Sequence, residues 1–135
     1  MKLLETSFLV DYEKGREAAR QYYQRHNHAE FTASTISMFE LAFGVVWDGT
    51  DDLQTLQQSL RWVNFLDFTV ADAIEGAQIQ AELQSAGERL PIGDVLIAGV
   101  ARTRGATLVA GDDHFERVDN LVVESHRTTG DAGNH

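Results

Sequence analysis

Five short apolar segments alternate with helical patterns along the chain, and this alternation constrains the fold more than any other feature of the sequence. The segments predicted as strands are 2–5, 31–33, 64–68, 107–110 and 121–124. Helical segments lie between them, so each strand must be joined to the next by a β-α-β crossover. Such crossovers are right-handed and give a parallel sheet with helices on both faces. The chain is therefore predicted to be an α/β protein with a parallel sheet.

Start and stop signals delimit two of the predicted helices. Thr69 and Asp72 have the S/T-x-x-D/E spacing that begins a helix, and Gly87 is placed to end it. Pro91 is predicted to be the first residue of the next helix, which Gly105 closes.

Two other helical segments carry apolar residues at the spacing of a helix that faces a core, i, i+3, i+4, i+7 and i+8. In the first segment these residues are Phe39, Ala42, Phe43, Val46 and Trp47. The stripe of the next segment comprises Leu53, Leu56, Leu60 and Val63. Both stripes are predicted to be buried. Residues 16–26 form a further predicted helix, which follows a break at Gly15.

Length and composition favour one intracellular domain. The chain has 135 residues, of which 43% are apolar and 24% charged, as is usual for a single globular domain. We expect the domain to cover residues 1–126 and a disordered tail to cover residues 127–135, which lack apolar content. No apolar run approaches the roughly 20 residues of a membrane helix, and no secretory signal is present. A cytoplasmic location without membrane contact is therefore expected.

The charge balance restricts which functions are possible. The net charge of -10 argues against a general nucleic-acid coat protein, because phosphate binding usually requires an excess of Lys and Arg. It leaves open an enzyme that meets phosphates through a metal ion. Because the chain has no cysteine, disulfides and thiolate metal sites are excluded, and oxygen and imidazole remain as metal ligands.

Acidic residues follow two of the predicted strands. Glu5 lies at the end of the first strand and Asp112 at the end of the fourth, so both should stand on the same rim of the sheet. In a parallel α/β sheet the ligand site lies at the carboxyl ends of the strands, near the point where the strand order reverses. Taken alone, Asp112 could be a turn residue and Glu5 an acid that pairs with the start of a helix. Asp113 is expected to be solvated.

Asp94 is harder to explain as a surface residue. If Pro91 is the first helical residue, Asp94 is the fourth, which is too deep to cap the helix. Its neighbours one and two turns further on are Ile97, Ala98 and Ala101, so the carboxylate should point inward. An inward carboxylate without a partner costs several kcal/mol or takes up a proton. Asp94 is therefore expected to need a cation.

Glu40 is a fourth candidate acid. It lies one position from the predicted apolar stripe of its helix, and Gly44 leaves open space one turn further on. By contrast, His26, His28 and His114 show neither H-x-x-H nor H-E-x-x-H spacing and are expected at the surface rather than as ligands.

Four carboxylates, in a chain that has no cysteine, form a set of oxygen ligands that suits Mg²⁺ or Mn²⁺. Such an ion lowers the pKa of a bound water and neutralises charge on the transition state of a phosphodiester, so metal-dependent phosphodiester hydrolysis is the chemistry that the acids favour. The sequence contains no G-x-S-x-G elbow, no Walker A loop and no G-x-G-x-x-G turn.

The same pattern resembles the PIN-domain ribonucleases and, within them, the VapC-type toxins of toxin-antitoxin pairs. The resemblance spans residues 2 to 124 and is carried by LLETSFLVDY, STISMFELAFG, LPIGDVLIAGVARTRGATLVAGDDHF and the closing LVV. The four acids of the family match Glu5, Glu40, Asp94 and Asp112 of this chain. Asp113 and His114 match positions that vary in the family.

The resemblance implies a PIN-like three-layer α/β/α sandwich with a central parallel sheet of four to five strands. It also implies an endoribonuclease toxin that depends on Mg²⁺ or Mn²⁺ and hydrolyses transfer, ribosomal or messenger RNA. A cognate antitoxin would cover the acidic site, often with a basic side chain, and toxins of this kind usually form homodimers.

In the mechanism that follows from these roles, Glu5 and Asp94 ligate the metal directly, and Asp112 binds it directly or through water. Glu40 positions or deprotonates the attacking water. Three arginines could contact phosphate or a partner protein, although each could also be simply solvated. They are Arg16, Arg20 and Arg89.

Two positions depart from the family. Glu5 replaces the usual aspartate, and its extra methylene moves the carboxylate by roughly 1.5 Å. A displacement near 1 Å can cost on the order of 10²-fold in rate, so a PIN-like protein that binds RNA or an antitoxin with weakened catalysis is the alternative. Ala110 stands where relatives often have a hydroxyl, which leaves Thr6 and Ser7 to orient the acids. A phosphatase of small phosphomonoesters is a third interpretation, but the first strand lacks its D-x-D pattern.

Overall fold

The computed structural model describes residues 1–49 and 51–127. The strands are β1 (Lys2–Leu4), β2 (Phe31–Ser34), β3 (Asn64–Leu66), β4 (Thr107–Ala110) and β5 (Val122–Ser125). The helices are α1 (Thr6–Glu13), α2 (Glu17–Arg25), α3 (Thr35–Asp48), α4 (Leu53–Ser59), α5 (Val70–Ser85), α6 (Ile92–Arg104) and the 3₁₀ helix η1 (Asp113–Arg117). Each predicted strand is present, with ends within two residues of the prediction. The sequence did not predict η1.

All five strands are parallel and are arranged in the order β3-β2-β1-β4-β5. From the central β1 the chain proceeds outward through β2 and β3, and then returns to the other side of β1 to form β4 and β5. The strand order therefore reverses between β1 and β4. The carboxyl ends of these two strands are the position at which a ligand site is expected in such a sheet.

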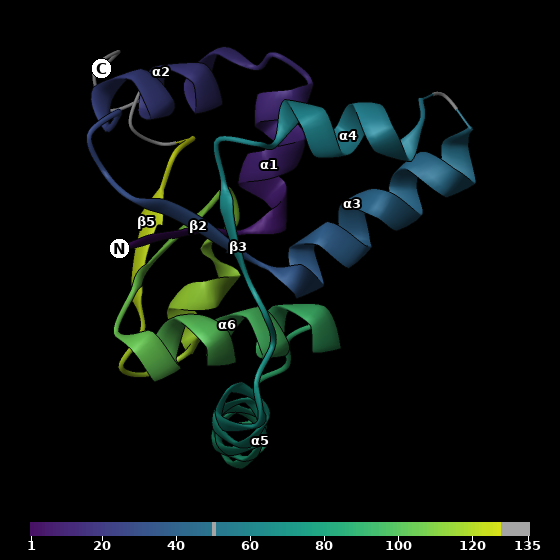
Figure 1. Ribbon diagram of the computed structural model, residues 1–135. Coiled ribbons are helices and arrows are strands. Elements are labelled where there is room, and N and C mark those ends of the chain that lie inside the picture. The colour runs from purple at the N-terminus through teal and green to yellow at the C-terminus, as the bar shows by residue number, and fades with distance from the viewer. Residues whose placement is uncertain (50, 128–135) are drawn as a thin grey trace.

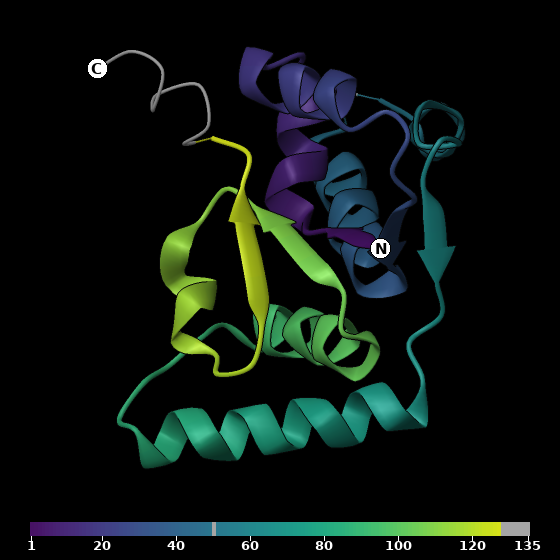
Figure 2. The ribbon, with the colours of Figure 1, turned by 90° about the vertical axis from the view of Figure 1, so that its left-hand side faces the viewer.

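Helices cover both faces of the sheet, which confirms the predicted α/β/α sandwich. Figures 1 and 2 show α1 to α4 on one side of the sheet and α6 on the other, with α5 along the outer side of α6. Side chains of β1 alternate between the two cores: Leu3 packs with the α5 and α6 residues, whereas Leu4 packs with those of α1, α2 and α4. The sheet is thus apolar on both faces, as parallel sheets generally are.

The pair α5–α6 confirms most of the predicted helix signals. Thr69 and Asp72 form a capping box at the start of α5, and Gly105 ends α6 with a positive φ of 61°. The helices approach so closely that a Cβ on Gly99 would lie 2.9 Å from the carbonyl oxygen of Asp72. One prediction was wrong: Pro91 is the N-cap, because its ψ of 148° is extended, so α6 begins at Ile92.

The predicted burial of the α3 stripe was wrong. Four of its five residues are exposed, namely Phe39, Phe43, Val46 and Trp47. The fully buried residues of α3 are Ser37 and Leu41. Apolar side chains lie on several faces of this helix, so spacing alone did not identify the face that packs against the small core of α1 and α4.

The predicted burial of the second apolar stripe was correct in part. Leu56, Leu60 and Val63 are buried, but Leu53 is 44% exposed, and Leu60 and Val63 follow the end of α4.

In the described part of the chain no helix has the length and apolar content to cross a membrane. Within the segment predicted to be disordered, Arg127 is described, and residues 128–135 lie outside the described ranges.

Candidate active site

Glu5 leaves the end of β1 and becomes the N-cap of α1. Its Oε1 accepts hydrogen bonds from the backbone N of Ser7 at 3.1 Å and from Ser7 Oγ at 2.5 Å. Only 4% of the residue is exposed. Glu5 is therefore both an acid at the start of a helix and an acid at the end of a strand, the two interpretations that the sequence left open.

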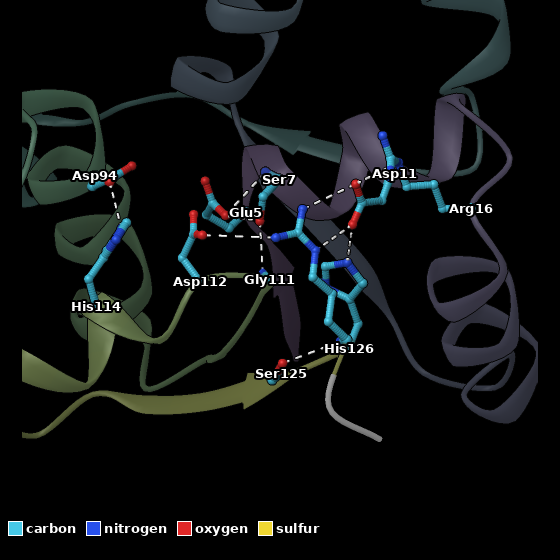
Figure 3. Close-up of polar contacts among 11 residues, drawn as sticks. Glu5, Ser7, Asp11, Arg16, Asp94, Gly111, Asp112, His114, Ser125 and His126 are labelled. Atoms are coloured by element: carbon cyan, nitrogen blue, oxygen red, sulfur yellow. Dashed lines mark hydrogen bonds and ion pairs between the residues drawn. The ribbon is translucent and has the colours of Figure 1, made fainter. Parts of the chain in front are cut away.

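A hydroxyl group links the ends of β1 and β4 at the point where the strand order reverses. Ser7 Oγ donates to Glu5 and accepts a hydrogen bond from the backbone N of Gly111 at 2.8 Å. Asp112 follows Gly111 directly, and its side chain is 48% exposed. Glu5 and Asp112 consequently stand on the same rim of the sheet, as their positions in the sequence predicted (Figure 3).

Asp94 enters this region from the first turn of α6. Its helical neighbours Ile97, Ala98 and Ala101 are fully buried, and its own side chain is 15% exposed. The Nε2 atom of His114 lies 2.9 Å from Asp94 Oδ2. The expectation that His114 is a plain surface residue was wrong: η1 turns the chain back after Asp112 and places this imidazole beside an acid of the site (Figure 3).

Glu40 approaches the same helix turn from α3. Thr6 Oγ1 donates to Glu40 Oε1 at 2.5 Å, and Ser37 Oγ lies 2.9 Å from the same hydroxyl. A Cβ on Gly93 would lie 2.6 Å from Glu40 Oε2, so the carboxylate rests over the residue that precedes Asp94. The expectation that Thr6 and Ser7 orient the acids is confirmed, since one holds Glu40 and the other holds Glu5.

Burial and neighbouring negative charge make ionisation of Glu5 and Asp94 costly. Burial, with smaller contributions from the negative charges of Asp94 and Asp112, raises the pKa of Glu5 to about 7 despite the hydrogen bonds from Ser7. Burial also raises the pKa of Asp94, against the opposing charge and contact of His114, and the charge of Asp112 adds to the increase. Three acids from distant parts of the chain thus interact electrostatically at one place.

The chemistry of these residues fits a hard divalent cation, because the acids supply oxygen and repel one another without a cation. As they are arranged in residues 1–49 and 51–127, no three acids or histidines are close enough together to hold an ion. Three of the four candidate acids instead have a side-chain partner. Ser7 Oγ donates to Glu5, Thr6 Oγ1 donates to Glu40, and His114 Nε2 lies 2.9 Å from Asp94.

A second polar cluster lies beside the rim, and the sequence did not predict it. Asp11 of α1 contacts His126 Nε2 at 2.9 Å and Arg127 Nε at 2.8 Å, and Arg16 Nε lies at 3.5 Å. Arg127 Nη1 in turn lies 3.9 Å from Asp112. No spacing signal could have found this cluster, because it joins residues 115 and 116 positions apart in the chain.

Comparison with known proteins gives a consistent result. The family model of the PIN domain matches residues 2–121. A tRNA(fMet)-specific endonuclease VapC of Shigella flexneri is 28% identical over 125 residues, which cover 90% of this chain and 95% of that protein. A second VapC of the same name, from Salmonella typhimurium strain LT2, is 29% identical over 101 residues, 73% of this chain and 76% of that protein.

Solved structures share the fold. The structure of VapBC2 from Rickettsia felis bound to a promoter DNA fragment superimposes with a TM-score of 0.80 at 24% identity. It covers 92% of this chain and 97% of the other. The expected resemblance to VapC-type PIN domains is therefore confirmed by the family model, by curated relatives and by fold.

Proposed function

Because this chain belongs to the PIN domain family, we propose that it is a metal-dependent endoribonuclease of the VapC type. The observation that carries the proposal is the electrostatic interaction of Glu5 with Asp94 and Asp112 beside the carboxyl ends of β1 and β4, where burial, with a smaller contribution from neighbouring negative charge, raises the pKa of Glu5 and of Asp94. Perturbed acids at the ligand-binding position of a parallel sheet mark a functional site.

In this proposal Glu5, Asp94 and Asp112 would hold Mg²⁺ or Mn²⁺, which requires their carboxylates to move closer together than they are in the described residues. The bound ion would lower the pKa of water and neutralise charge that develops on the phosphodiester. Glu40 accepts the proton of the attacking water at its carboxylate, which Thr6 holds in place at 2.5 Å.

The substrate that we propose is RNA, with transfer RNA as the first one to test. Two curated relatives carry the name tRNA(fMet)-specific endonuclease, and the matched segment includes all four proposed site acids. Phosphodiester hydrolysis agrees with an acidic site in a chain of net charge -10, because a cation held by the acids would mediate contact with the phosphate.

We further propose an antitoxin partner that docks against α3. A groove of about 440 Å³ between α1, α3 and α4 is lined by apolar residues and by four acids against one lysine, Lys14. Its lining includes Leu41, Val45, Leu56, Glu13, Glu40, Asp48 and Asp51. The exposed rings of Phe43 and Trp47 stack beside it with centroids 6.0 Å apart. A partner segment with apolar and basic side chains would fit this surface, and because Glu40 lines the groove the segment would reach the site.

The resemblance also led us to expect a homodimer, and we retain this as a proposal. Val70 and Ile74 lie one turn apart on α5 and are 77% and 57% exposed. Light scattering of the purified chain, and of a Val70→Ser/Ile74→Ser variant, would give the mass directly. A wild-type mass of one chain would contradict the proposal.

The alternative is a PIN-like protein that binds RNA or the antitoxin without efficient cleavage. It is favoured by Glu5, which replaces the usual aspartate and whose carboxylate is engaged by Ser7. RNA binding without cleavage, in the presence of Mn²⁺, would support this alternative.

The decisive experiment is incubation of the purified chain with total RNA and with transfer RNA in Mn²⁺ or Mg²⁺, with and without a chelator. Cleavage should require the metal and should fall at least about 100-fold in Asp94→Asn and Asp112→Asn, the loss that follows removal of one electrostatic group from a site. Asp67→Asn is the matched control, since Asp67 is an exposed acid that follows another strand, β3. Metal-dependent cleavage that persists in Asp94→Asn would refute the assignment.

A further inference from the structure

Arg127, just after the end of β5, has a guanidinium group that is fixed in place. Its Nε donates to Asp11 Oδ2 at 2.8 Å and its Nη2 donates to Asp11 Oδ1 at 3.2 Å. Its backbone N donates to Ser125 Oγ at 3.2 Å. A paired contact of this kind fixes the plane of the guanidinium as well as its position.

The anchor is itself rigid. The side chain of Asp11 is 6% exposed, and its Oδ2 contacts Nε2 of His126, which is fully buried with its ring edge-on to Phe8. Although burial opposes ionisation, hydrogen bonds from Arg127 and His126 hold the pKa of Asp11 below its usual value. Asp11 is thus a charged and immobile partner at neutral pH.

The remaining nitrogen of Arg127 faces the rim of the candidate site. Nη1 lies 3.9 Å from Asp112 Oδ1, and it makes no hydrogen bond to any described residue. The guanidinium covers the backbone of Gly111, because a Cβ there would lie 2.5 Å from the Cζ of Arg127. Nη1 is therefore a donor that makes an ion pair but no hydrogen bond with a proposed metal ligand, and the side chain of Arg127 is 44% exposed.

We propose that Arg127 binds a phosphate of the RNA backbone adjacent to the scissile bond; the inference rests on the proposed nuclease function. RNA that approaches four acids needs a cation to offset repulsion, and a fixed guanidinium with a free N–H suits a phosphate oxygen. A hollow of about 400 Å³ beside Asp112 leaves room for a nucleotide. The charged residues that line it, Asp112, Asp113 and Glu116, are all acidic, so a phosphate there needs a cation from outside the lining, and Arg127 Nη1 lies 3.9 Å from Asp112 Oδ1.

Two of the arginines suggested by the sequence, Arg16 and Arg20, are less suited to this role. Arg16 contacts Asp11 at 3.5 Å, but it lies beyond Asp11 on the side away from Asp112 (Figure 3). Arg20 stacks over the ring of Tyr12 and donates to the carbonyl of that residue. Arg16 therefore provides a matched control, because it is a partner of the same carboxylate that does not face the rim.

The test measures RNA binding rather than cleavage and uses the Asp94→Asn background, in which the proposed function predicts intact RNA. Binding of labelled transfer RNA in Mn²⁺ is titrated over a range of salt concentrations. Arg127→Gln should weaken binding about tenfold at low salt, and should reduce the slope of log K against log salt by about 0.7 to 0.9, the value for one lost phosphate contact. Arg127→Lys should keep the slope, and Arg16→Gln should change neither quantity.

An unchanged slope in Arg127→Gln, or an equal loss in Arg16→Gln, would overturn the inference. If Arg127→Gln does not fold, the same question is answered in the Asp94→Asn protein with an arginine-selective dicarbonyl reagent and peptide mass spectrometry. RNA should protect Arg127 several-fold and leave Arg16 as reactive as before. Equal modification of Arg127 with and without RNA would overturn the inference. Cleavage of the RNA in this background would instead refute the proposed function, so the two failures are distinguishable.

Discussion

Asp72 and Glu5 are both almost completely buried, yet the fold treats them in opposite ways. Asp72, at the start of α5, receives Arg104 Nη1 at 2.6 Å and the backbone N of Thr69 at 2.9 Å. Although burial opposes it, these partners hold the pKa of Asp72 below its usual value. Glu5 receives only the hydroxyl and amide of Ser7, and burial raises its pKa to about 7.

This difference distinguishes Asp72, whose charge stabilises the fold, from Glu5, whose ionisation destabilises it. A buried carboxylate is tolerated when a cation and hydrogen bonds replace its hydration, as they do for Asp72. Among residues 1–49 and 51–127, no arginine lies within hydrogen-bonding distance of Glu5, Asp94 or Asp112, since Arg127 Nη1 is 3.9 Å from Asp112 Oδ1. Ionisation of Glu5 and Asp94 therefore costs free energy that a bound cation would offset, which is the property of a binding site.

The largest expected effect is a pH dependence of stability in the chelated protein. The pKa of Glu5 is about 7 in the folded state against an ordinary 4.5, so the folded state retains a proton that the unfolded state releases. The stabilisation from this group is complete below pH 4.5 and is lost as pH rises through about 7. At 1.36 kcal/mol per pH unit the loss is about 3 kcal/mol. Urea unfolding between pH 4.5 and 7.5 measures it.

Glu5→Gln is the control for this measurement, because other groups also titrate in the range. The difference in unfolding free energy between wild type and Glu5→Gln should fall by about 3 kcal/mol across the interval. A constant difference would show that Glu5 ionises normally, and the contrast with Asp72 would disappear.

The next effect is on stability at neutral pH. Asp72→Asn removes the charge that pairs with Arg104 and should destabilise the protein by about 2 kcal/mol, less than for a fully enclosed pair because the Arg104 side chain is 21% exposed. Asp94→Asn should leave the unfolding free energy equal or higher, since it removes a carboxylate whose burial raises its pKa. Denaturant titrations of both variants in chelator make the comparison. Equal destabilisation would mean that Asp94 serves the fold as Asp72 does.

A third prediction asks whether Glu5 limits catalysis. Glu5→Asp withdraws the carboxylate by one methylene and restores the residue that the family resemblance leads us to expect at this position. Cleavage of transfer RNA in Mn²⁺ should rise by about tenfold, within the range that a shift near 1 Å can produce. A lower rate in Glu5→Asp than in wild type would show that this site is built around the longer side chain.

Much of this arrangement followed from the sequence, because the rules that govern it are local. Glu5 and Asp112 were assigned to one rim because both follow strands, and parallel strands end on the same side of a sheet. Asp94 was assigned inward because of its buried helical neighbours, although α6 begins one residue later than predicted. The parallel sheet with helices on both faces followed from the alternation of elements, and the four- to five-stranded α/β/α sandwich followed from the resemblance to PIN domains.

What the sequence did not predict depends on contacts between distant residues. The partners of Asp11 lie at the other end of the chain, and the segment that holds Arg127 had been assigned to a disordered tail. The direction of His114 is set by η1, a short turn without a periodic pattern. On α3, apolar residues lie on several faces, so their spacing did not show which face is buried. Exposure there depends on which other elements pack against the helix.

The smallest expected effect concerns the hydroxyl that holds Glu40, which tests whether hydrogen bonds alone can orient a rim acid. Thr6→Val keeps the shape of the side chain and removes the donor to Glu40 Oε1. The loss of one hydrogen bond to a charged group that can still reach water is worth about 1 kcal/mol, so kcat should fall roughly fivefold with little change in KM. Thr103→Val is the matched control, because its hydroxyl donates to the carbonyl of Gly99 within α6. If both variants reduce kcat equally, the effect is one of helix stability, and the rim acids are oriented by something other than their hydroxyl partners.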